Sequence, residues 1–342
     1  MNDDLVAVLV GCGGISHAWL RTLVETPNLQ LAALVDLNED AARARAEEFN
    51  LSDTRTSTDL TAVLDEVQPD IVFDCTVPPA HHPVTLEALR HRCHVLGEKP
   101  LADSLAHARE MVAAAEAANR LYAVMQNRRY DPNIRRLKAF LASGAIGRIT
   151  TVNCDFYIGA HFGGFRDRME HVLLLDMAIH TFDQARFIMG ADPVAVYCKE
   201  WNPPASWYDH DASAVAIFEM TDDVVYTYRG SWCAEGLNTT WESGWRIIGE
   251  QGSVAWDGGA GFQAQAVVEV GGFLSKVEDV AVPEYEAPTK TGGHAGAIHE
   301  FLQCVRTGCV PETVCTDNIK SLAMVFGAVE SAESGARVVI DA

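Results

Sequence analysis

Length, composition and charge exclude several classes of protein. The chain has 342 residues, of which 48% are hydrophobic and 21% are charged, and its formal net charge is −21. This length is sufficient for two domains, and the composition is ordinary for a folded globular protein. The negative charge argues against a nucleic-acid partner, because neutralising phosphates requires a basic face.

Signals for membranes, secretion and metals are also missing from the sequence. No run of about 18 apolar residues is present, so we expect no membrane partner. The start, MNDDLVAVLV, carries acids where a signal peptide would be basic. The nine cysteines are scattered without a C-x-x-C pair, which favours a cytoplasmic location over a disulfide framework. Histidines and cysteines do not cluster, and we expect no metal site.

Apolar runs alternate with helical stretches in the first part of the chain. The expected strands are 5–10, 31–36, 71–78, 94–100 and 121–126. The expected helices are 17–25, an Ala-, Arg- and Glu-rich stretch after Asp36, one that ends near Arg90, and 104–120. Strands that alternate with helices predict an α/β Rossmann domain, a doubly wound parallel sheet, over residues 1–125.

A glycine pattern, G-x-G-x-x-S, follows the first expected strand and opens the first expected helix. Gly11 permits a tight turn, Gly13 lets the backbone approach a pyrophosphate, and Ser16 is small enough to keep helix and strand close. The helix N-terminus offers N–H groups to phosphates. The predicted cofactor-binding residues of this loop are Gly11, Cys12, Gly13, Gly14 and Ile15.

Asp36 ends the second expected strand, about twenty residues beyond the glycine pattern, as a dinucleotide-binding fingerprint requires. A carboxylate there accepts hydrogen bonds from the adenosine ribose and repels a 2′-phosphate. Residues 37–40 contain no arginine or lysine that could hold such a phosphate. The sequence therefore predicts NAD as cofactor and makes NADP the less favoured choice.

The second part of the chain has the sequence pattern of an antiparallel sheet. The expected strands are 148–159, 194–201, 213–220, 224–232, 239–249 and 253–258, with turns at 222–223 and 249–252. We expect a surface excursion at 271–293 and closing helices at 295–307 and 317–334. This pattern predicts an α+β domain over residues 126–342 with a large, mainly antiparallel open sheet. Its broad face favours a homodimer or homotetramer.

One expected helix, 173–190, carries polar residues in an apolar stretch, LLLDMAIHTFDQARFIMG. Asp176, His180 and Asp183 fall in one stripe, because residues three, four and seven apart share a helical face. A solvated stripe would explain this spacing without any function. A site of proton chemistry would explain it too.

Two further motifs give the sequence a family resemblance. Glu98-Lys99-Pro100 ends the strand at 94–100, and the later helix carries D-x-x-x-H-x-x-D. In that order and context they resemble the glucose–fructose oxidoreductase / inositol dehydrogenase / MocA (Gfo/Idh/MocA) family. The likeness covers nearly the whole chain and includes Thr76, His81 and the segments 127–131 and 143–147.

The resemblance implies an oxidoreductase that oxidises a hydroxyl of a cyclic sugar, sugar acid or inositol-like polyol. It implies that Lys99 lies beside the nicotinamide and the reacting hydroxyl, that Asp176 holds substrate, and that His180 takes the proton. The chemistry agrees. Oxidation of an alcohol releases a hydride and a proton, and histidine has a pKa near neutrality. A lysine can donate to the oxygen as negative charge develops on it.

The remaining site residues follow from their places in the same pattern. Outside the glycine loop, the predicted cofactor-binding residues are Asp36, Thr76, His81, Glu98 and Lys99. The predicted substrate-binding residues are Asn127, Arg128, His161, Arg166, Asp176 and His180. Other interpretations stay open: His81 could cap its helix, Arg166 could form a salt bridge on its loop, and Asp183 could bind backbone or an arginine.

Two other functions are compatible with the pattern. One is an NAD-binding sensor of the same fold without chemistry, against which the joint presence of Lys99, Asp176 and His180 counts. The other is a redox-neutral use of NAD in glycoside cleavage or epimerisation. Product formation without net NADH would identify it.

Overall fold

The computed structural model describes residues 4–285 and 290–341, which form two compact units. Unit 1 comprises residues 4–130 and 290–319, and unit 2 comprises residues 131–285 and 320–341. None of the helices in the described ranges is both long and apolar enough to cross a bilayer.

Unit 1 contains a six-stranded sheet of order β3-β2-β1-β4-β5-β6 in which neighbouring strands are parallel. The strands are β1 (Leu5–Val10), β2 (Leu29–Val35), β3 (Arg55–Ser57), β4 (Ile71–Asp74), β5 (His94–Gly97) and β6 (Tyr122–Val124). The helices are α1 (Ser16–Leu23), α2 (Glu39–Glu48), α3 (Leu60–Val67), α4 (Pro78–Arg90), α5 (Leu105–Ala118), α8 (His294–Thr307) and the 3-10 turn η1 (Asn127–Tyr130). This is the predicted doubly wound sheet. Its strand order reverses between β1 and β4, where such sheets bind their ligands.

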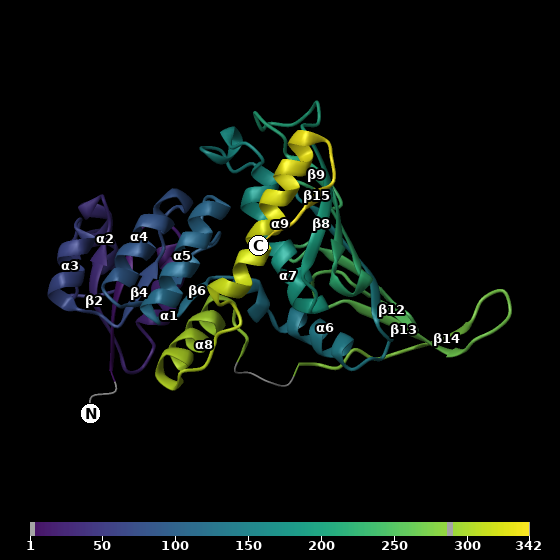
Figure 1. Ribbon diagram of the computed structural model, residues 1–342, viewed down its shortest axis with the longest axis horizontal. Coiled ribbons are helices and arrows are strands. Elements are labelled where there is room, and N and C mark those ends of the chain that lie inside the picture. Colours follow the sequence, from purple (N-terminus) through teal and green to yellow (C-terminus); the bar gives the residue numbers. More distant parts are fainter. Residues whose placement is uncertain (1–3, 286–289, 342) are drawn as a thin grey trace. The chain divides into compact units, whose positions relative to one another are not determined.

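Helix α8 completes the core of unit 1, although it is distant in sequence (Figure 1). Ile298 and Phe301 of α8 are fully buried in one cluster with Trp19 of α1 and Leu9 of β1. The sequence suggested two consecutive domains that meet after residue 125. Instead, 126–130 and 290–319 belong to unit 1, because the apolar face of α8 packs in this core.

A disulfide joins Cys304 of α8 to Cys309. The scattered cysteines predicted no disulfide, and for this pair the prediction is wrong. Gly308, in the left-handed conformation, ends α8 and reverses the chain, so that Cys309 returns to the last turn of the helix.

Unit 2 contains a nine-stranded sheet of order β14-β13-β12-β11-β7-β10-β9-β8-β15. Among the described strands of this sheet, β7 and β10 form the one parallel pair. The strands are β7 (Ile149–Tyr157), β8 (Pro193–Trp201), β9 (Ser213–Met220), β10 (Val225–Ser231), β11 (Gly244–Gly249), β12 (Gly252–Trp256), β13 (Phe262–Glu269), β14 (Lys276–Asp279) and β15 (Val338–Val339). The helices are α6 (Pro132–Ala142), the π-helix η3 (Leu173–Ala178), α7 (Ile179–Met189), α9 (Cys315–Ser334, which begins in unit 1) and the 3-10 turns η2 (Arg166–Arg168) and η4 (Thr221–Asp223).

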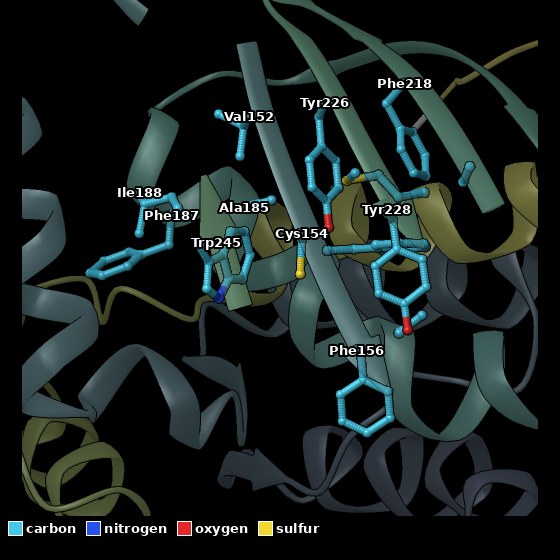
Figure 2. Close-up of a cluster of buried hydrophobic side chains, with 14 of the residues drawn as sticks. Val152, Cys154, Phe156, Ala185, Phe187, Ile188, Phe218, Tyr226, Tyr228 and Trp245 are labelled. Carbon is cyan, nitrogen blue, oxygen red and sulfur yellow. The ribbon is translucent and has the colours of Figure 1, made fainter. Parts of the chain in front are cut away.

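One face of the unit 2 sheet is buried against helices and the other is exposed. Figure 2 shows side chains of β7, β9, β10 and β11 gathered with those of α7; they include Phe156, Phe218, Tyr226 and Phe187. Residues at alternate positions point the other way and are exposed; examples are Tyr197, Trp201, Ile217, Val225 and Ile248. The predicted open, mainly antiparallel sheet is confirmed.

The two closing helices, α8 and α9, and the turns of unit 2 were placed correctly, whereas the edge strands of unit 2 were missed. Asp222 and Asp223 have positive φ between β9 and β10, and Gly249 pairs with Gly252 across the β11–β12 hairpin. The segment expected as an excursion at 271–293 contains β14, which pairs with β13 in a projecting hairpin (Figure 1). Residues 286–289 of that segment lie outside the described residues.

Candidate active site

The loop between β1 and α1 has the backbone that the glycine pattern predicts. Gly11 has φ +90°, and a Cβ there would lie 2.7 Å from the carbonyl carbon and oxygen of Cys75. A side chain is therefore excluded at Gly11. A Cβ on Gly13 or Gly14 would meet no described atom within 4 Å. The open space beside these two glycines is where a pyrophosphate would need to approach.

Helix α1 begins directly behind this loop. Its N-cap is Ile15, and among the described residues no side chain caps it. Ser16 is fully buried, and its hydroxyl donates to the carbonyl oxygen of Gly13 over 2.6 Å. The positive end of the α1 dipole therefore adjoins the open side of the loop, an arrangement that suits an anionic ligand. These residues fit the phosphates of a dinucleotide.

Asp36 and Arg45 hold the loop from two sides. Oδ2 of Asp36 accepts from the backbone N–H of Cys12 over 2.7 Å, and Oδ1 accepts from Asn38 N–H over 2.8 Å. Nη2 of Arg45, on α2, donates to the carbonyl oxygens of Gly13 at 3.1 Å and Cys12 at 3.5 Å. Asp36 thus adjoins the glycine loop. Arg45 was missed, because its distance in sequence gives no sign of this contact.

Cys12 contributes backbone to the loop, and its side chain lies in the core. The side chain is 3% exposed. Burial, with a smaller contribution from the charge of Asp36, raises the pKa of the Cys12 thiol to about 12. The thiol therefore stays protonated at neutral pH and does not bring a second negative charge to the phosphate side of the loop.

Thr76 and His81 are brought together by a third residue, Asp74, at the end of β4. Asp74 is fully buried, and its Oδ1 accepts from the backbone N–H (2.9 Å) and the hydroxyl (2.5 Å) of Thr76. Its Oδ2 lies 2.9 Å from Nδ1 of His81. Burial alone would raise the pKa of the Asp74 carboxyl, but His81 and the hydrogen bonds from Thr76 outweigh it and hold the pKa below its usual range.

This arrangement changes the assignment of His81. The imidazole is 1% exposed, so it offers almost no surface to a cofactor. It does not cap α4 either, because the N-cap there is Val77 and no side chain of the described chain caps that helix. His81 acts on Asp74, which in turn fixes Thr76. The sequence signal for Asp74 was its place as an acid at the end of a buried strand.

Glu98 connects the end of β5 with α1 and α8. It is 7% exposed and accepts from the indole N–H of Trp19 over 2.7 Å and from the backbone N–H of Lys99 over 3.1 Å. Nε2 of His294 lies 3.8 Å from Glu98, and Nδ1 of the same ring lies 3.5 Å from the side-chain nitrogen of Asn127. Glu98 therefore fixes the backbone that carries Lys99. Sequence reasoning missed Trp19 and His294.

The short helix η1 places Asn127 and Arg128, both half-buried, at the end of β6. Its next two residues anchor it. Nη1 of Arg129 donates to the carbonyl oxygen of Glu312 over 2.7 Å, and the hydroxyl of Tyr130 donates to Glu300 over 2.5 Å. Asn127 and Arg128 thus lie on a fixed turn of unit 1, at the carboxyl edge of its sheet.

In unit 2, Asp176 lies in the π-helix and His180 in the first turn of α7; both are half-buried. Nε and Nη2 of Arg166 donate to the two carboxylate oxygens of Asp176 over 2.8 and 3.3 Å. The predicted substrate residue Arg166 is therefore ion-paired, one of the interpretations left open. π-Helical turns are frequent at functional sites.

Asp183 departs from the predicted stripe. It is 1% exposed and accepts from the hydroxyl of Ser321 over 2.8 Å. The predicted stripe assumes a regular helix with 3.6 residues per turn. The turn that contains Asp176 is π-helical and wider, so the side chains before and after it no longer line up on one face. Asp183 belongs to the packing of α7 against α9.

His161 is not brought to Asp176 by the described contacts. Its ring stacks on Trp207 with centroids 3.6 Å apart, and its Nε2 lies 3.0 Å from Glu235. Trp232, which packs edge-on against Phe162 of the same loop, is 1% exposed and belongs to the core. In the described part of the chain, no three His, Cys, Asp or Glu side chains are arranged to hold a metal ion.

Two family models match the chain, one after the other. A model of the oxidoreductase family with an NAD-binding Rossmann fold matches residues 5–126, and a model of the GFO/IDH/MocA C-terminal domain matches residues 134–255. The chain is similar to a D-apiose dehydrogenase of Paraburkholderia graminis, with 27% identity over 96% of this chain and 88% of the relative. It is 32% identical to inositol 2-dehydrogenase 4 of Saccharopolyspora erythraea over 57% of either chain.

A solved structure has the same fold throughout. It is an oxidoreductase from Agrobacterium radiobacter in complex with NAD+, L-tartaric acid and magnesium, with a TM-score of 0.85 over 98% of both chains at 22% identity. The match covers both units of the present chain.

Proposed function

The chain belongs to the Gfo/Idh/MocA oxidoreductase family, and from that premise we propose that it oxidises a hydroxyl of a cyclic sugar, sugar acid or inositol-like polyol, with NAD as the acceptor of the hydride. The observation that carries the proposal is the bond between Asp36 and the backbone N–H of Cys12. It sets the carboxylate that we propose for ribose binding against the glycine loop at the start of α1. The named sugar dehydrogenases among the relatives support the substrate class.

The residues of unit 1 would hold the dinucleotide. The pyrophosphate would lie against Gly13 and Gly14 at the start of α1, and the adenosine ribose would hydrogen-bond to Asp36. When bound, NAD supplies the nicotinamide that takes up the hydride. The chain's own task is to hold the ring in place, and Thr76 and the backbone at Glu98-Lys99 are the residues we propose for it.

Three side chains would handle the proton and the charge of the substrate. We propose that His180 accepts the hydroxyl proton, that Lys99 donates a hydrogen bond to the same oxygen, and that Asp176 orients the substrate or the imidazole. The bidentate contact with Arg166 supports this role for Asp176, because it fixes both carboxylate oxygens. Asn127, Arg128 and Arg166 are proposed to contact the substrate.

A screen of substrates tests the function directly. The purified protein with NAD would be given monosaccharides, inositols and sugar acids, and NADH would be followed by its absorbance. We expect turnover with at least one member of the panel. NAD binding without turnover on any member would contradict the proposal, and product without net NADH would indicate redox-neutral chemistry instead.

The preference for NAD over NADP depends on Asp36. We expect Asp36→Ala with Leu37→Arg to shift the ratio of kcat/KM values for NAD and NADP by about 100-fold toward NADP, because repulsion is removed and a cation is added. Leu37 is 95% exposed and tolerates the new side chain. An unchanged ratio would refute the assignment of Asp36.

The open face of the unit 2 sheet is our proposed surface for self-association. It exposes Tyr197, Trp201 and Ile217 on neighbouring strands, and contiguous exposed apolar surface marks interfaces. Light scattering on the full chain should give the mass of a dimer or tetramer, and a monomeric mass would contradict it. A cytoplasmic location stays a prediction from the scattered cysteines, and the Cys304–Cys309 bridge weighs against it.

A further inference from the structure

The loop that precedes the π-helix exposes two phenylalanines. Phe162 is 41% exposed and Phe165 is 65% exposed, although both are large apolar side chains. Gly163 and Gly164 separate them and have φ of +69° and +73°. These left-handed residues turn the chain sharply between the two rings. Two exposed aromatic rings on one loop call for an explanation, because burial of each ring would have stabilised the fold.

The base of the loop is fixed. The carbonyl oxygen of Ala160 accepts hydrogen bonds from the indole of Trp207 (2.9 Å) and the hydroxyl of Tyr208 (2.6 Å). After the phenylalanines, the carbonyl oxygen of Asp167 accepts from Asp209 N–H over 2.7 Å. The two rings are therefore presented from an anchored loop, which lowers the entropic cost of using them to bind a ligand.

Arg166 links the two rings to Asp176. Its guanidinium carbon lies over both rings, 5.0 Å from the centroid of Phe162 and 4.8 Å from that of Phe165. The same guanidinium makes the bidentate contact with the carboxylate of Asp176. We call Phe162, Phe165 and Arg166 the aromatic stack. It is an apolar surface that continues directly into the residue proposed to orient the substrate.

The chemistry of the aromatic stack selects its occupant. The charge of Arg166 is offset by Asp176, and the chain carries a formal net charge of −21, so the surface does not attract an anion. Flat apolar rings beside hydrogen-bonding groups suit a neutral ligand with an apolar face and polar edges. A sugar ring has this form, since its C–H groups gather on one face and its hydroxyls lie around the edge.

We propose that the aromatic stack is a subsite for a second sugar ring, joined by a glycosidic bond to the ring whose hydroxyl is oxidised. The substrate class is then a disaccharide or other glycoside, rather than a free monosaccharide. This inference rests on the proposed function and deepens it. The second ring packs its apolar face on Phe165 and Phe162, and its linkage lies toward Arg166 and Asp176.

The test compares matched substrates in matched variants. Each monosaccharide of a panel, such as glucose and galactose, is paired with disaccharides that contain it, such as cellobiose, maltose and lactose. The variant is Phe165→Ala, because Phe165 is the more exposed ring, whereas Phe162 contacts the buried Trp232 and its loss could disturb the fold. Phe165→Trp keeps an aromatic surface. Phe273→Ala, at a 99% exposed site between β13 and β14, is the control.

We expect wild-type protein to have a higher kcat/KM for a disaccharide than for its monosaccharide. Phe165→Ala should lower the value for the disaccharide about tenfold more than the value for the monosaccharide. Phe165→Trp should restore it, and Phe273→Ala should match wild type. Calorimetric titration of the NAD-loaded protein with the same disaccharides should show the matching change in binding.

Several outcomes would overturn the inference. Equal losses for both substrates in Phe165→Ala, no loss in either, or a wild-type preference for the monosaccharide would each do so while leaving the proposed function intact. If no member of the panel is oxidised, the proposed function fails. In that case the calorimetric titration still tests the subsite by itself. If wild-type protein binds no disaccharide, the subsite is overturned too.

Discussion

The glycine loop of unit 1 and the Asp176 region of unit 2 are held by different kinds of bond. In the glycine loop the important contacts involve the main chain: Asp36 binds Cys12 N–H, and Arg45 binds the carbonyl of Gly13. In unit 2 they join side chains: Arg166 pairs with Asp176. Main-chain requirements restrict which residue can stand at a position, so they are written in the sequence as a motif. An ion pair between side chains can be formed by several combinations of residues, so no sequence motif indicates it.

The largest expected effect comes from removing the groups that handle the proton. We expect His180→Ala and Lys99→Ala each to lower kcat by about two to four decades, because acid–base catalysis contributes that much. The dissociation constant of NAD should change little. His299→Ala, at an exposed position of α8, is the control. Full turnover in either variant would contradict the catalytic role that we propose for the substituted residue.

Two alanine substitutions should separate the folding role of the glycine loop from its binding role. Gly11→Ala should lower the free energy of unfolding by about 2–4 kcal/mol, because the new Cβ would strike the backbone of Cys75 at a positive φ. Gly13→Ala should leave stability within about 0.5 kcal/mol of wild type. It should weaken NAD binding about tenfold or more, because its Cβ would fill the space for the pyrophosphate.

Denaturant titration and calorimetry with NAD measure the two effects of these substitutions. The idea that backbone requirements dominate unit 1 would be refuted by a stable Gly11→Ala. Unaltered NAD affinity in Gly13→Ala would show that the open space beside this residue is not the phosphate site.

A smaller effect is expected from the side-chain pair of unit 2. Arg166→Lys keeps the charge but loses the bidentate geometry, so Asp176 should be held less firmly. We expect kcat/KM for the substrate to fall about tenfold, with NAD affinity the same as in wild type. Arg168→Lys, on the exposed side of the same loop, is the matched control. If both variants lose activity equally, the loop rather than the Arg166–Asp176 pair is responsible.

A pH dependence of stability is also expected in unit 1. Burial, helped by the charge of Arg120, lowers the pKa of His94 to about 4. Its Nδ1 accepts from the backbone N–H of Leu121 over 3.0 Å, which requires the neutral ring. The unfolded chain, with a pKa of about 6.5, takes up the proton more readily. Stability should therefore fall as the pH drops from about 6.5 to about 4, by roughly 2 kcal/mol.

His94→Asn tests this pH dependence, because an amide oxygen can accept the same bond and does not titrate. Urea unfolding at several pH values should give a shallower slope for this variant. His299→Asn, at an exposed site, should keep the wild-type slope. Parallel slopes for His94→Asn and wild type would contradict the buried-histidine explanation.

Much of the fold was predictable because its signals are local. Apolar runs that end in glycine or aspartate gave the parallel sheet, and alternating patterns gave the core of the second sheet. The missed strands have little such signal: β3 is three residues long, and β14 is exposed along its whole length. The disulfide was missed because proximity of Cys304 and Cys309 depends on how the chain turns at Gly308.

The candidate site divides in the same way. The tight turn at Gly11 and the place of Asp36 directly after β2 were predicted, because both depend on neighbours in the strand and helix. The binding roles of Gly11, Gly13 and Asp36 stay predictions. Trp19 and His294 were not predicted, since each meets its partner only when distant segments pack together. Asp74 was missed although its partner His81 follows only seven residues later, because no motif marks this pair. The predicted stripe of 173–190 failed at Asp183, because periodicity assumes a regular helix throughout and the structure has a π-helix over Leu173–Ala178, before Asp183.

The return of α8 to the first sheet has a consequence for the biogenesis of the protein. Domains usually fold in order as they leave the ribosome. Here the core around Trp19 and Leu9 needs Ile298 and Phe301, which are synthesised after nearly the whole second sheet. The N-terminal part of the nascent chain must therefore wait with an apolar surface uncovered. Chaperone capture of this intermediate, and poor recovery of any fragment truncated before residue 294, are the expected cellular signs of that delay.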